Sequence, residues 1–281
     1  IAGLIARWYY EAGLRYSKVY CIGKDKEQTK TRRFEEARTS IELSPGYDHV
    51  RERLPGEWAL RNKESYRCVR TGSLVRALPV DAKGEAGGKP AIQLWTEVWG
   101  ITTEDGKRFW EELTPIPTIP DSMRVVETYA GYLQESELLY QLYETGQSGH
   151  QLTARELTDR TGVALDAFHE AGDDPDTLIP IWENKSASLL MYWDSGLNAR
   201  RMPWQRDDRG QEYYRTQELT LPSPAFRRLH HNEWVSSEAN FIRPEMWASC
   251  EEQLEPLEFG DTTPEHVVEN HTGNGDEQSD G

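Results

Sequence analysis

Cysteine is scarce in this sequence, and the few that occur stand far apart. Cys21, Cys68 and Cys250 are the only three among 281 residues, and no two of them form a C-x-x-C pair. Zinc sites and disulfide frameworks need cysteines at characteristic spacings, so neither is indicated here. This cysteine usage fits a reducing cytoplasm.

Long apolar runs and an excess of positive charge are also missing. No apolar stretch approaches the ~20 residues of a membrane-spanning helix, so we expect no membrane contact. The opening segment IAGLIARWYYEAGLRYSK is too polar and too aromatic for a signal peptide. It is predicted to be an amphipathic helix, and the absence of an initiator Met suggests a fragment. The 32 basic against 48 acidic residues give a net charge of -16. This charge argues against a surface whose main task is to grip phosphates.

The sequence does contain an alternation of short apolar strands with helices. Strands are expected at 18–22, at 65–80 as a pair around Thr71–Gly72, at 91–97 and at 123–128. Helices are expected at 3–16, 26–43, 102–113 and 136–144. This alternation predicts an α/β fold with a mostly parallel sheet flanked by helices.

After about residue 150 the pattern weakens. Residues 151–180 show no clear periodicity and leave room for short strands or hairpins, whereas helices are predicted near 186–196 and 209–218. The acidic end of the chain has few apolar anchors and is predicted to be disordered. We therefore expect three parts: a core over 1–180, a small, mostly helical lid or linker subdomain over 181–250, and an acidic tail over 251–281.

Two predicted strands end in polar residues. The strand AIQLW is followed by Thr96 and Glu97, and the strand over 123–128 ends in Glu127 and Thr128. Ligands of parallel sheets bind beyond the carboxyl ends of the strands, so Glu97 and Thr128 share one rim if the strands are neighbours. A carboxylate there can polarise a water for attack on a phosphate, and a hydroxyl can sense a γ-phosphate. The alternative is that Glu97 only pairs with an arginine or caps the next helix.

Four longer stretches carry a resemblance to a known family. They are SLVRALPVDAKGEAGGKPAIQLWTEVWG (73–100), RVVETYAGYLQESELLYQLY (124–143), YWDSGLNARRMPWQ (192–205) and FRRLHHNEWVSSEANFI (226–242). In order and spacing they resemble the large terminase subunit of tailed bacteriophages, the ATPase that pumps DNA into a capsid. The resemblance covers most of residues 1–260.

The resemblance implies a fold and a set of roles. The fold is that of the P-loop NTPases, of the ASCE or RecA-like class. Residues 91–97 become the Walker B strand, and Glu97 becomes the catalytic carboxylate that orients water. Thr96 takes the magnesium-shell position, with no direct metal ligation by a side chain. The coupling motif contains Thr128, Tyr129 and Gly131.

The same resemblance implies cofactors and partners for the intact protein. ATP and Mg²⁺ are the expected cofactors. Double-stranded DNA, the portal protein and the small terminase subunit are the expected partners, and a homo-oligomeric ring is expected on the portal. The protein is then expected in the host cytoplasm and transiently at the procapsid portal.

The sequence departs from the family pattern in three ways. The Walker B aspartate of most relatives is replaced by Thr96. No G-x-x-x-x-G-K-[ST] loop occurs, and Gly23–Lys24–Asp25 lacks the earlier glycine and the hydroxyl. We expect the phosphate loop to lie before Ile1, and the 281-residue chain alone to be inactive. The nuclease domain expected after about residue 262 is absent, and Asp276, Glu277 and Asp280 are interpreted as part of the solvated tail.

Other candidates leave alternatives open. Arg200, Arg201, Arg227 and Arg228 are candidates for DNA contact, for an arginine finger or for lid contacts, and ordinary solvated or interdomain arginines are the alternative. The pair His230–His231 lacks a third ligand and is interpreted as packing. A helicase-like P-loop ATPase and a catalytically degenerate interaction or assembly module are the alternative functions, and the latter is consistent with Thr96 and the missing loop.

Overall fold

The computed structural model describes residues 2–29, 34–43, 58–62, 64–68, 71–85, 88–162 and 174–236. All of them belong to one compact unit from Ile1 to Ala239. The predicted acidic tail over 251–281, with Asp276, Glu277 and Asp280, lies outside the described residues.

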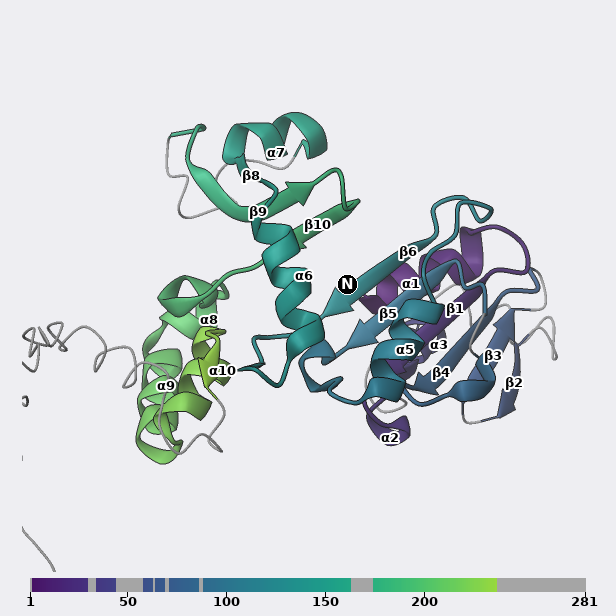
Figure 1. Ribbon diagram of the computed structural model, residues 1–281, viewed down its shortest axis with the longest axis horizontal. Coiled ribbons are helices and arrows are strands. Elements are labelled where there is room, and N and C mark those ends of the chain that lie inside the picture. Colours follow the sequence, from purple (N-terminus) through teal and green to yellow (C-terminus); the bar gives the residue numbers. More distant parts are fainter. Residues whose placement is uncertain are drawn as a thin grey trace, which may run out of the picture. The chain divides into compact units, whose positions relative to one another are not determined.

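A six-stranded sheet forms the core, with the strand order β2-β3-β4-β1-β5-β6 (Figure 1). Four neighbouring strands are parallel: β4 (Leu74–Pro79), β1 (Lys18–Gly23), β5 (Ile92–Thr96) and β6 (Met123–Glu127). Beside β4, the strands β3 (Ser65–Cys68) and β2 (Trp58–Asn62) continue the sheet in antiparallel order. The predicted mostly parallel α/β sheet is therefore confirmed.

Strands β1 and β5 are buried on both faces, because helices cover both sides of the sheet. Val19 and Cys21 belong to a cluster with α1 (Ala2–Ala12) and α3 (Glu35–Glu42). The intervening Tyr20 and Ile22 pack with α5 (Glu104–Glu112) instead. This burial on both faces explains why the two strands are mostly apolar in sequence, as buried parallel strands are, with Gln93 of β5 as a buried polar exception.

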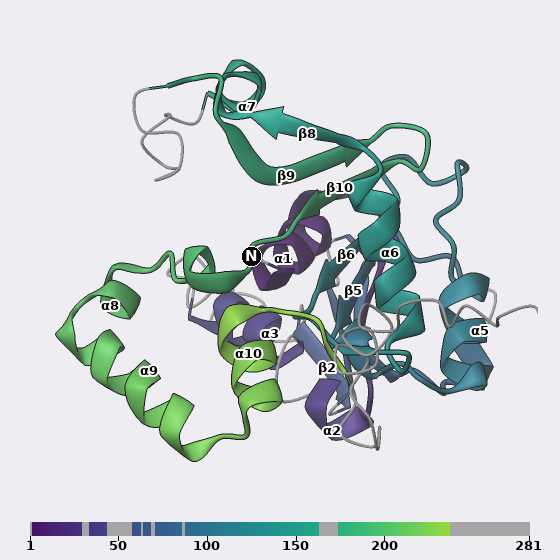
Figure 2. The same cartoon turned by 60° about the vertical axis from the view of Figure 1, so that its left-hand side comes forward.

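The helices of the core begin close to where the sequence predicts them. Helix α5 starts after Thr103, whose side chain accepts a hydrogen bond from Gly106 N at 3.2 Å. Helix α6 (Glu137–Gln147) contacts the turn after β5 at one end and β9 and β10 further along, as Figure 2 shows. The predicted helix over 26–43 contains two described pieces, α2 (Lys26–Thr29) and α3.

A second, antiparallel sheet follows α6, in the order β10-β9-β8. It contains β8 (His150–Thr153), β9 (Leu178–Asn184) and β10 (Leu189–Tyr192), with α7 (Ala154–Thr161) after β8. The predicted helix near 186–196 is therefore wrong. Residues 189–192 alternate between half-buried and exposed, which is the two-residue period of a strand.

The last described elements are mostly helical. They are the 3-10 turn Gly196–Ala199, α8 (Pro203–Arg206), α9 (Asp208–Thr220), α10 (Ser223–His231) and β11 (Val235–Ser236), which pairs with β7 (Tyr132–Leu133). Helix α9 confirms the prediction near 209–218. Strand β9 runs across residue 180, so the boundary expected there falls inside a strand, and the subdivision at that point stays a prediction. Among the described helices, none is long and apolar enough to cross a membrane.

Candidate functional site

The carboxyl ends of β5 and β6 lie side by side. Thr96 is in register with Glu127, and the backbone N–H of Glu97 donates to the carbonyl of Glu127 at 3.0 Å. Glu97 and Thr128, each the first residue after its strand, therefore share one rim of the sheet, as the sequence predicted. Crevices at this rim are where parallel sheets bind ligands.

Glu97 has an unusual backbone conformation. Its φ of 54° and ψ of 44° place it in the left-handed region, where it starts the 3-10 turn Val98–Gly100. A residue with a side chain occupies this region at a cost in free energy, and such residues cluster at functional sites. Its side chain makes no capping hydrogen bond to the turn that it starts, and the next helix is capped by Thr103. Helix capping therefore does not explain this carboxylate.

The segments after Glu97 and Thr128 are tied together by hydrogen bonds. The backbone N–H of Trp99 donates to Thr128 Oγ1 at 3.4 Å, and Ser136 Oγ donates to the carbonyl of Trp99 at 2.8 Å. Ser136 Oγ also accepts from the backbone N–H of Tyr132 at 3.1 Å. A Cβ on Gly131 would lie 2.0 Å from that hydroxyl oxygen, so this close approach requires glycine.

Thr96 is almost fully buried, with 6% of its surface exposed. A Cβ on Gly23, at the end of β1, would lie 3.1 Å from Thr96 Oγ1 and 2.7 Å from Thr29 Oγ1. The hydroxyl of Thr96 therefore faces the end of β1, in a narrow space that a side chain on Gly23 would fill.

Sequence reasoning missed a cation close to this rim. The Nζ of Lys24, the first residue after β1, lies 5.8 Å from the ring centroid of Trp99. A Cβ on Gly100 would lie 3.3 Å from Lys24 Cδ, so the lysine stem runs along this turn. Because β1 is the neighbour of β5, the rule that placed Glu97 and Thr128 at the rim also applies to Lys24.

Three of the four arginine candidates are engaged elsewhere in the chain. Arg201 pairs with Asp194, and both side chains are largely buried. The guanidinium carbon of Arg200 lies 3.7 Å from the ring centroid of Tyr214. Arg227 is exposed and donates to Glu233 at 2.7 Å. Their contact with DNA stays a prediction, as does that of Arg228, which is buried.

The two histidines pack as the sequence suggested. The ring of His230 lies within 6 Å of Tyr213, Tyr214 and Phe226. Burial, and then the charges of Arg200 and His231, lower the pKa of His230. Within the part of the chain that the structure describes, no three His, Cys, Asp or Glu side chains are grouped so that they could hold a metal ion.

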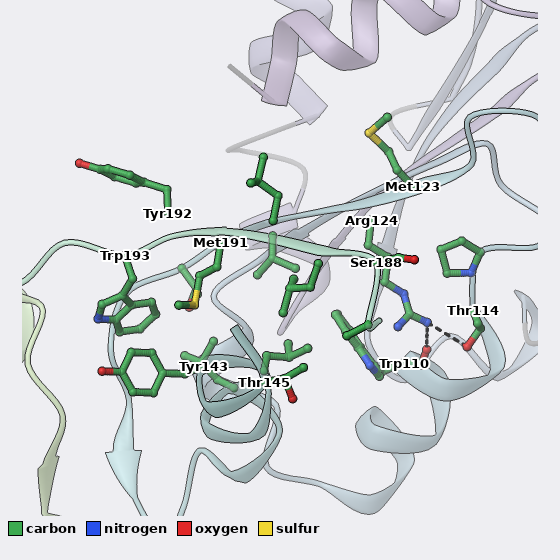
Figure 3. Close-up of a pocket in the computed structure, with 18 of the residues that line it drawn as sticks. Trp110, Thr114, Met123, Arg124, Tyr143, Thr145, Ser188, Met191, Tyr192 and Trp193 are labelled. Atoms are coloured by element: carbon green, nitrogen blue, oxygen red, sulfur yellow. Dashed lines mark hydrogen bonds between the residues drawn. The ribbon is translucent and has the colours of Figure 1, made fainter. Parts of the chain in front are cut away.

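A groove of about 670 Å³ lies beside β6 (Figure 3). Its lining is largely apolar and comes mostly from β6, α6 and β10, together with Trp110 of α5, and it includes Arg124 and Thr128. The Arg124 guanidinium lies 4.1 Å from the Trp110 ring centroid, and burial lowers the pKa of Arg124 to about 10. Glu97 and Thr96 do not line this groove, so the groove and the rim share Thr128 alone among the candidates.

Comparisons with known proteins show which solved structures this fold is similar to. No family model matches the chain. No curated protein matches it either. The structure is similar to the crystal structure of the HK97 bacteriophage large terminase, with a TM-score of 0.52 and 14% identity, over 89% of this chain and 46% of that one. The chain shares the fold of the matched part of this phage large terminase. The predicted fold and the predicted resemblance are thus both confirmed, at the level of structure.

Two further solved structures come from the ATPase domain of the Thermus phage P74-26 large terminase. Its mutant form gives a TM-score of 0.46 and 14% identity over 83% of each chain. The unmutated form gives 0.44 and 15%, over 83% of this chain and 82% of that one. The chain spans less than half of the length of the HK97 protein.

Proposed function

We propose that this chain is the ATP-hydrolysing part of a phage terminase large subunit, which couples hydrolysis to the packaging of double-stranded DNA. One observation carries the proposal: Glu97 stands in a strained left-handed conformation at the carboxyl end of β5, beside Thr128 at the end of β6. The shared fold with the HK97 large terminase supports it.

Glu97, Thr128 and Lys24 each have a separate role in the proposed hydrolysis of ATP. The Glu97 carboxylate accepts a hydrogen bond from a water, orients it and takes part of its proton during attack on the γ-phosphate. The Thr128 hydroxyl connects this event to the loop of Tyr129 and Gly131, because it already bonds to the turn after Glu97. Lys24 adds a positive charge close to the same turn.

The described residues fit only part of an ATP–Mg²⁺ site. Mg²⁺ keeps several waters and is held by one or two carboxylates together with phosphate oxygens. Glu97 and the hydroxyls of Thr96 and Thr128 provide oxygen atoms at the rim. When bound, Mg²⁺ would neutralise phosphate charge. No G-x-x-x-x-G-K-[ST] sequence occurs among the 281 residues, so these residues do not supply a phosphate-binding loop of that kind.

The proposal includes partners and a place of action. The portal protein, the small terminase subunit and DNA are the proposed partners, with a homo-oligomeric ring at the procapsid portal in the host cytoplasm. A helicase-like ATPase and a degenerate assembly module remain the competing functions. The buried hydroxyl of Thr96 at the magnesium-shell position is consistent with the degenerate module.

The deciding experiment is Glu97→Gln in the intact protein, with the exposed Glu112→Gln on α5 as the matched control. We expect Glu97→Gln to lower the hydrolysis rate by ~10²–10⁴ while ATP binding is retained, because the amide keeps the shape but cannot polarise water. Phosphate release and nucleotide binding are measured on both variants. Normal hydrolysis by Glu97→Gln would remove the catalytic role of Glu97, whereas the absence of hydrolysis by the wild-type intact protein would favour the degenerate module. The 281-residue chain by itself should hydrolyse little ATP.

A further inference from the structure

Arg228 is a buried cation on helix α10. Only 7% of its surface is exposed. Its guanidinium carbon lies 4.6 Å from the ring centroid of Trp99, 5.1 Å from that of Tyr129 and 4.6 Å from that of Tyr132. We call these three rings the aromatic cage.

The cage takes the place of the carboxylate that a buried arginine usually has. Arg228 Nε and Nη1 are buried and have no hydrogen-bond partner in the structure, and among the described residues no acidic side chain pairs with the guanidinium. The electron-rich faces of aromatic rings attract a desolvated cation, so the cage compensates part of the cost of burial. These cation–π contacts hold Arg228 against the three rings, but they leave the Nε and Nη1 donors without hydrogen bonds. Arg228 can therefore be released from the cage.

The cage connects α10 to both segments of the candidate rim. Trp99 lies two residues after Glu97, and Tyr129 directly follows Thr128. The rings of Trp99 and Tyr129 also contact each other, with centroids 5.7 Å apart. Arg228 therefore packs against the residues that flank the hydrogen bond between Trp99 N and Thr128 Oγ1.

A second contact anchors the end of the same helix. Asn232, directly after α10, accepts a hydrogen bond from the backbone N–H of Ala130 at 2.6 Å. Its amide donates to the carbonyl of Asp194 at 2.7 Å. Val235 then pairs with Tyr132 in a short parallel ladder. Helix α10 is thus held to the loop after β6 at two points beyond Arg228.

We propose that Arg228 is a positioning residue for ATP hydrolysis: it holds the segments after Glu97 and Thr128 in one arrangement and makes that arrangement depend on the position of α10. This proposal rests on the proposed function. Movement of α10 would withdraw the cation from the cage, free the Trp99 and Tyr129 rings, and disturb the carboxylate that orients the water.

The first test needs no catalytic activity. Hydrogen exchange is followed in the 281-residue chain for Arg228→Met, Arg228→Lys and the control Arg215→Met, whose side chain is exposed on α9. In Arg228→Met we expect exchange to be about tenfold faster in residues 97–101 and 128–133, as loss of a cation–π contact allows, and unchanged in β1. Arg228→Lys should lie in between, because it keeps the charge but lacks the planar group. Unchanged exchange at both segments in Arg228→Met overturns the proposal. Equally fast exchange at these segments in Arg228→Lys and Arg228→Met overturns it as well.

The second test measures steady-state hydrolysis in the intact protein. We expect Arg228→Met to lower kcat about tenfold with KM changed less than threefold, because a positioning residue acts on the reacting water and not on nucleotide affinity. Arg215→Met should hydrolyse normally. A kcat of Arg228→Met equal to that of Arg215→Met overturns the positioning role. Normal hydrolysis by Glu97→Gln contradicts the proposed function instead, and the exchange result still decides whether Arg228 couples α10 to the two segments.

Discussion

Gln93 Oε1 accepts a hydrogen bond from Arg124 Nε at 3.2 Å, in the interior of the sheet between β5 and β6. The same oxygen accepts from the indole N–H of Trp95 at 3.0 Å, and the Gln93 amide donates to the carbonyl of Leu113. Gln93 has no exposed surface. One buried amide thus satisfies polar groups from β5, β6 and the end of α5.

Replacing this amide should destabilise the core. Gln93→Leu leaves Arg124 Nε and the Trp95 indole without their acceptor, and we expect a loss of about 1–3 kcal/mol in the free energy of unfolding. Chemical denaturation followed by circular dichroism measures it, with Gln141→Leu on the exposed side of α6 as the control. Equal stability of Gln93→Leu and wild type would show that the network contributes nothing.

The loop after β6 should not tolerate a methyl group. In Gly131→Ala the new Cβ would lie 2.0 Å from Ser136 Oγ and 2.4 Å from Ser136 Cβ, so the loop must shift. We expect a loss of about 1–3 kcal/mol, as for other overpacked sites. Gly84→Ala, where no atom lies within 4 Å of the new Cβ, serves as the control in the same melting experiment. A Gly131→Ala protein as stable as Gly84→Ala contradicts the described geometry.

Replacing Thr128 should impair DNA translocation more than ATP hydrolysis. In the intact protein we expect Thr128→Ala to hydrolyse ATP at a reduced but measurable rate and to fail in DNA translocation, because the Trp99 N–H loses its acceptor while Glu97 stays in place. Thr128→Ser keeps the hydroxyl and should translocate. Phosphate release and a packaging assay are compared for the two variants. Full translocation by Thr128→Ala would remove the coupling role.

The half-buried His230 should make stability depend on pH. Burial lowers the pKa of His230 below its ordinary value of 6.5, so the unfolded chain binds this proton more tightly. Its contribution is complete above pH 6.5 and is lost as the pH falls below that value. We expect His230→Gln to flatten the fall in stability between pH 7.5 and 5, by at most about 1.4 kcal/mol per pH unit, the value for one proton. The exposed His150→Gln is the control. Parallel curves for wild type and His230→Gln would contradict this assignment.

DNA binding by the 281-residue chain should be weak at physiological salt. The net charge of -16 opposes the approach of a phosphate backbone. Any binding should weaken steeply as the salt concentration rises. If the exposed Arg227 contacts a DNA phosphate, Arg227→Ala should lower the slope of log affinity against log salt concentration by about one. Fluorescence anisotropy with duplex DNA over a range of salt concentrations measures both. Tight binding to one sequence that ignores salt would indicate a specific DNA-binding protein.

The sequence predicted the sheet and its rim well because both depend on local signals. Buried parallel strands read as apolar runs, and Thr103 followed by acidic residues is a strong helix start. The helix predicted near 186–196 was wrong because LLMY (189–192) is a short apolar run that fits a helix or a strand equally well. Only its pairing with β9 decides between them. Helix α7 was missed, although Thr153 and Glu156 form a capping box that the sequence displays.

The role of Arg228 could not be read from the sequence. The pair Arg227–Arg228 consists of identical residues, and the two side chains differ only in the direction in which α10 projects them. Arg227 reaches solvent and Glu233, whereas Arg228 enters a cage whose rings come from positions 96 to 129 residues earlier. Such a contact depends on how distant segments fold against each other, which no local pattern encodes.

Strand β6 has consequences for handling the protein. In the described part of the chain it pairs with β5 alone. Met123 N and the carbonyl of Glu127 bond toward β5, so the backbone groups of Arg124 and Val126 point to the opposite side. An edge strand of this kind is a template on which another strand can add, and natural proteins usually shield it. We therefore expect concentrated solutions of the 281-residue chain to show edge-to-edge self-association, and a short parallel β-peptide that pairs with β6 to reduce it.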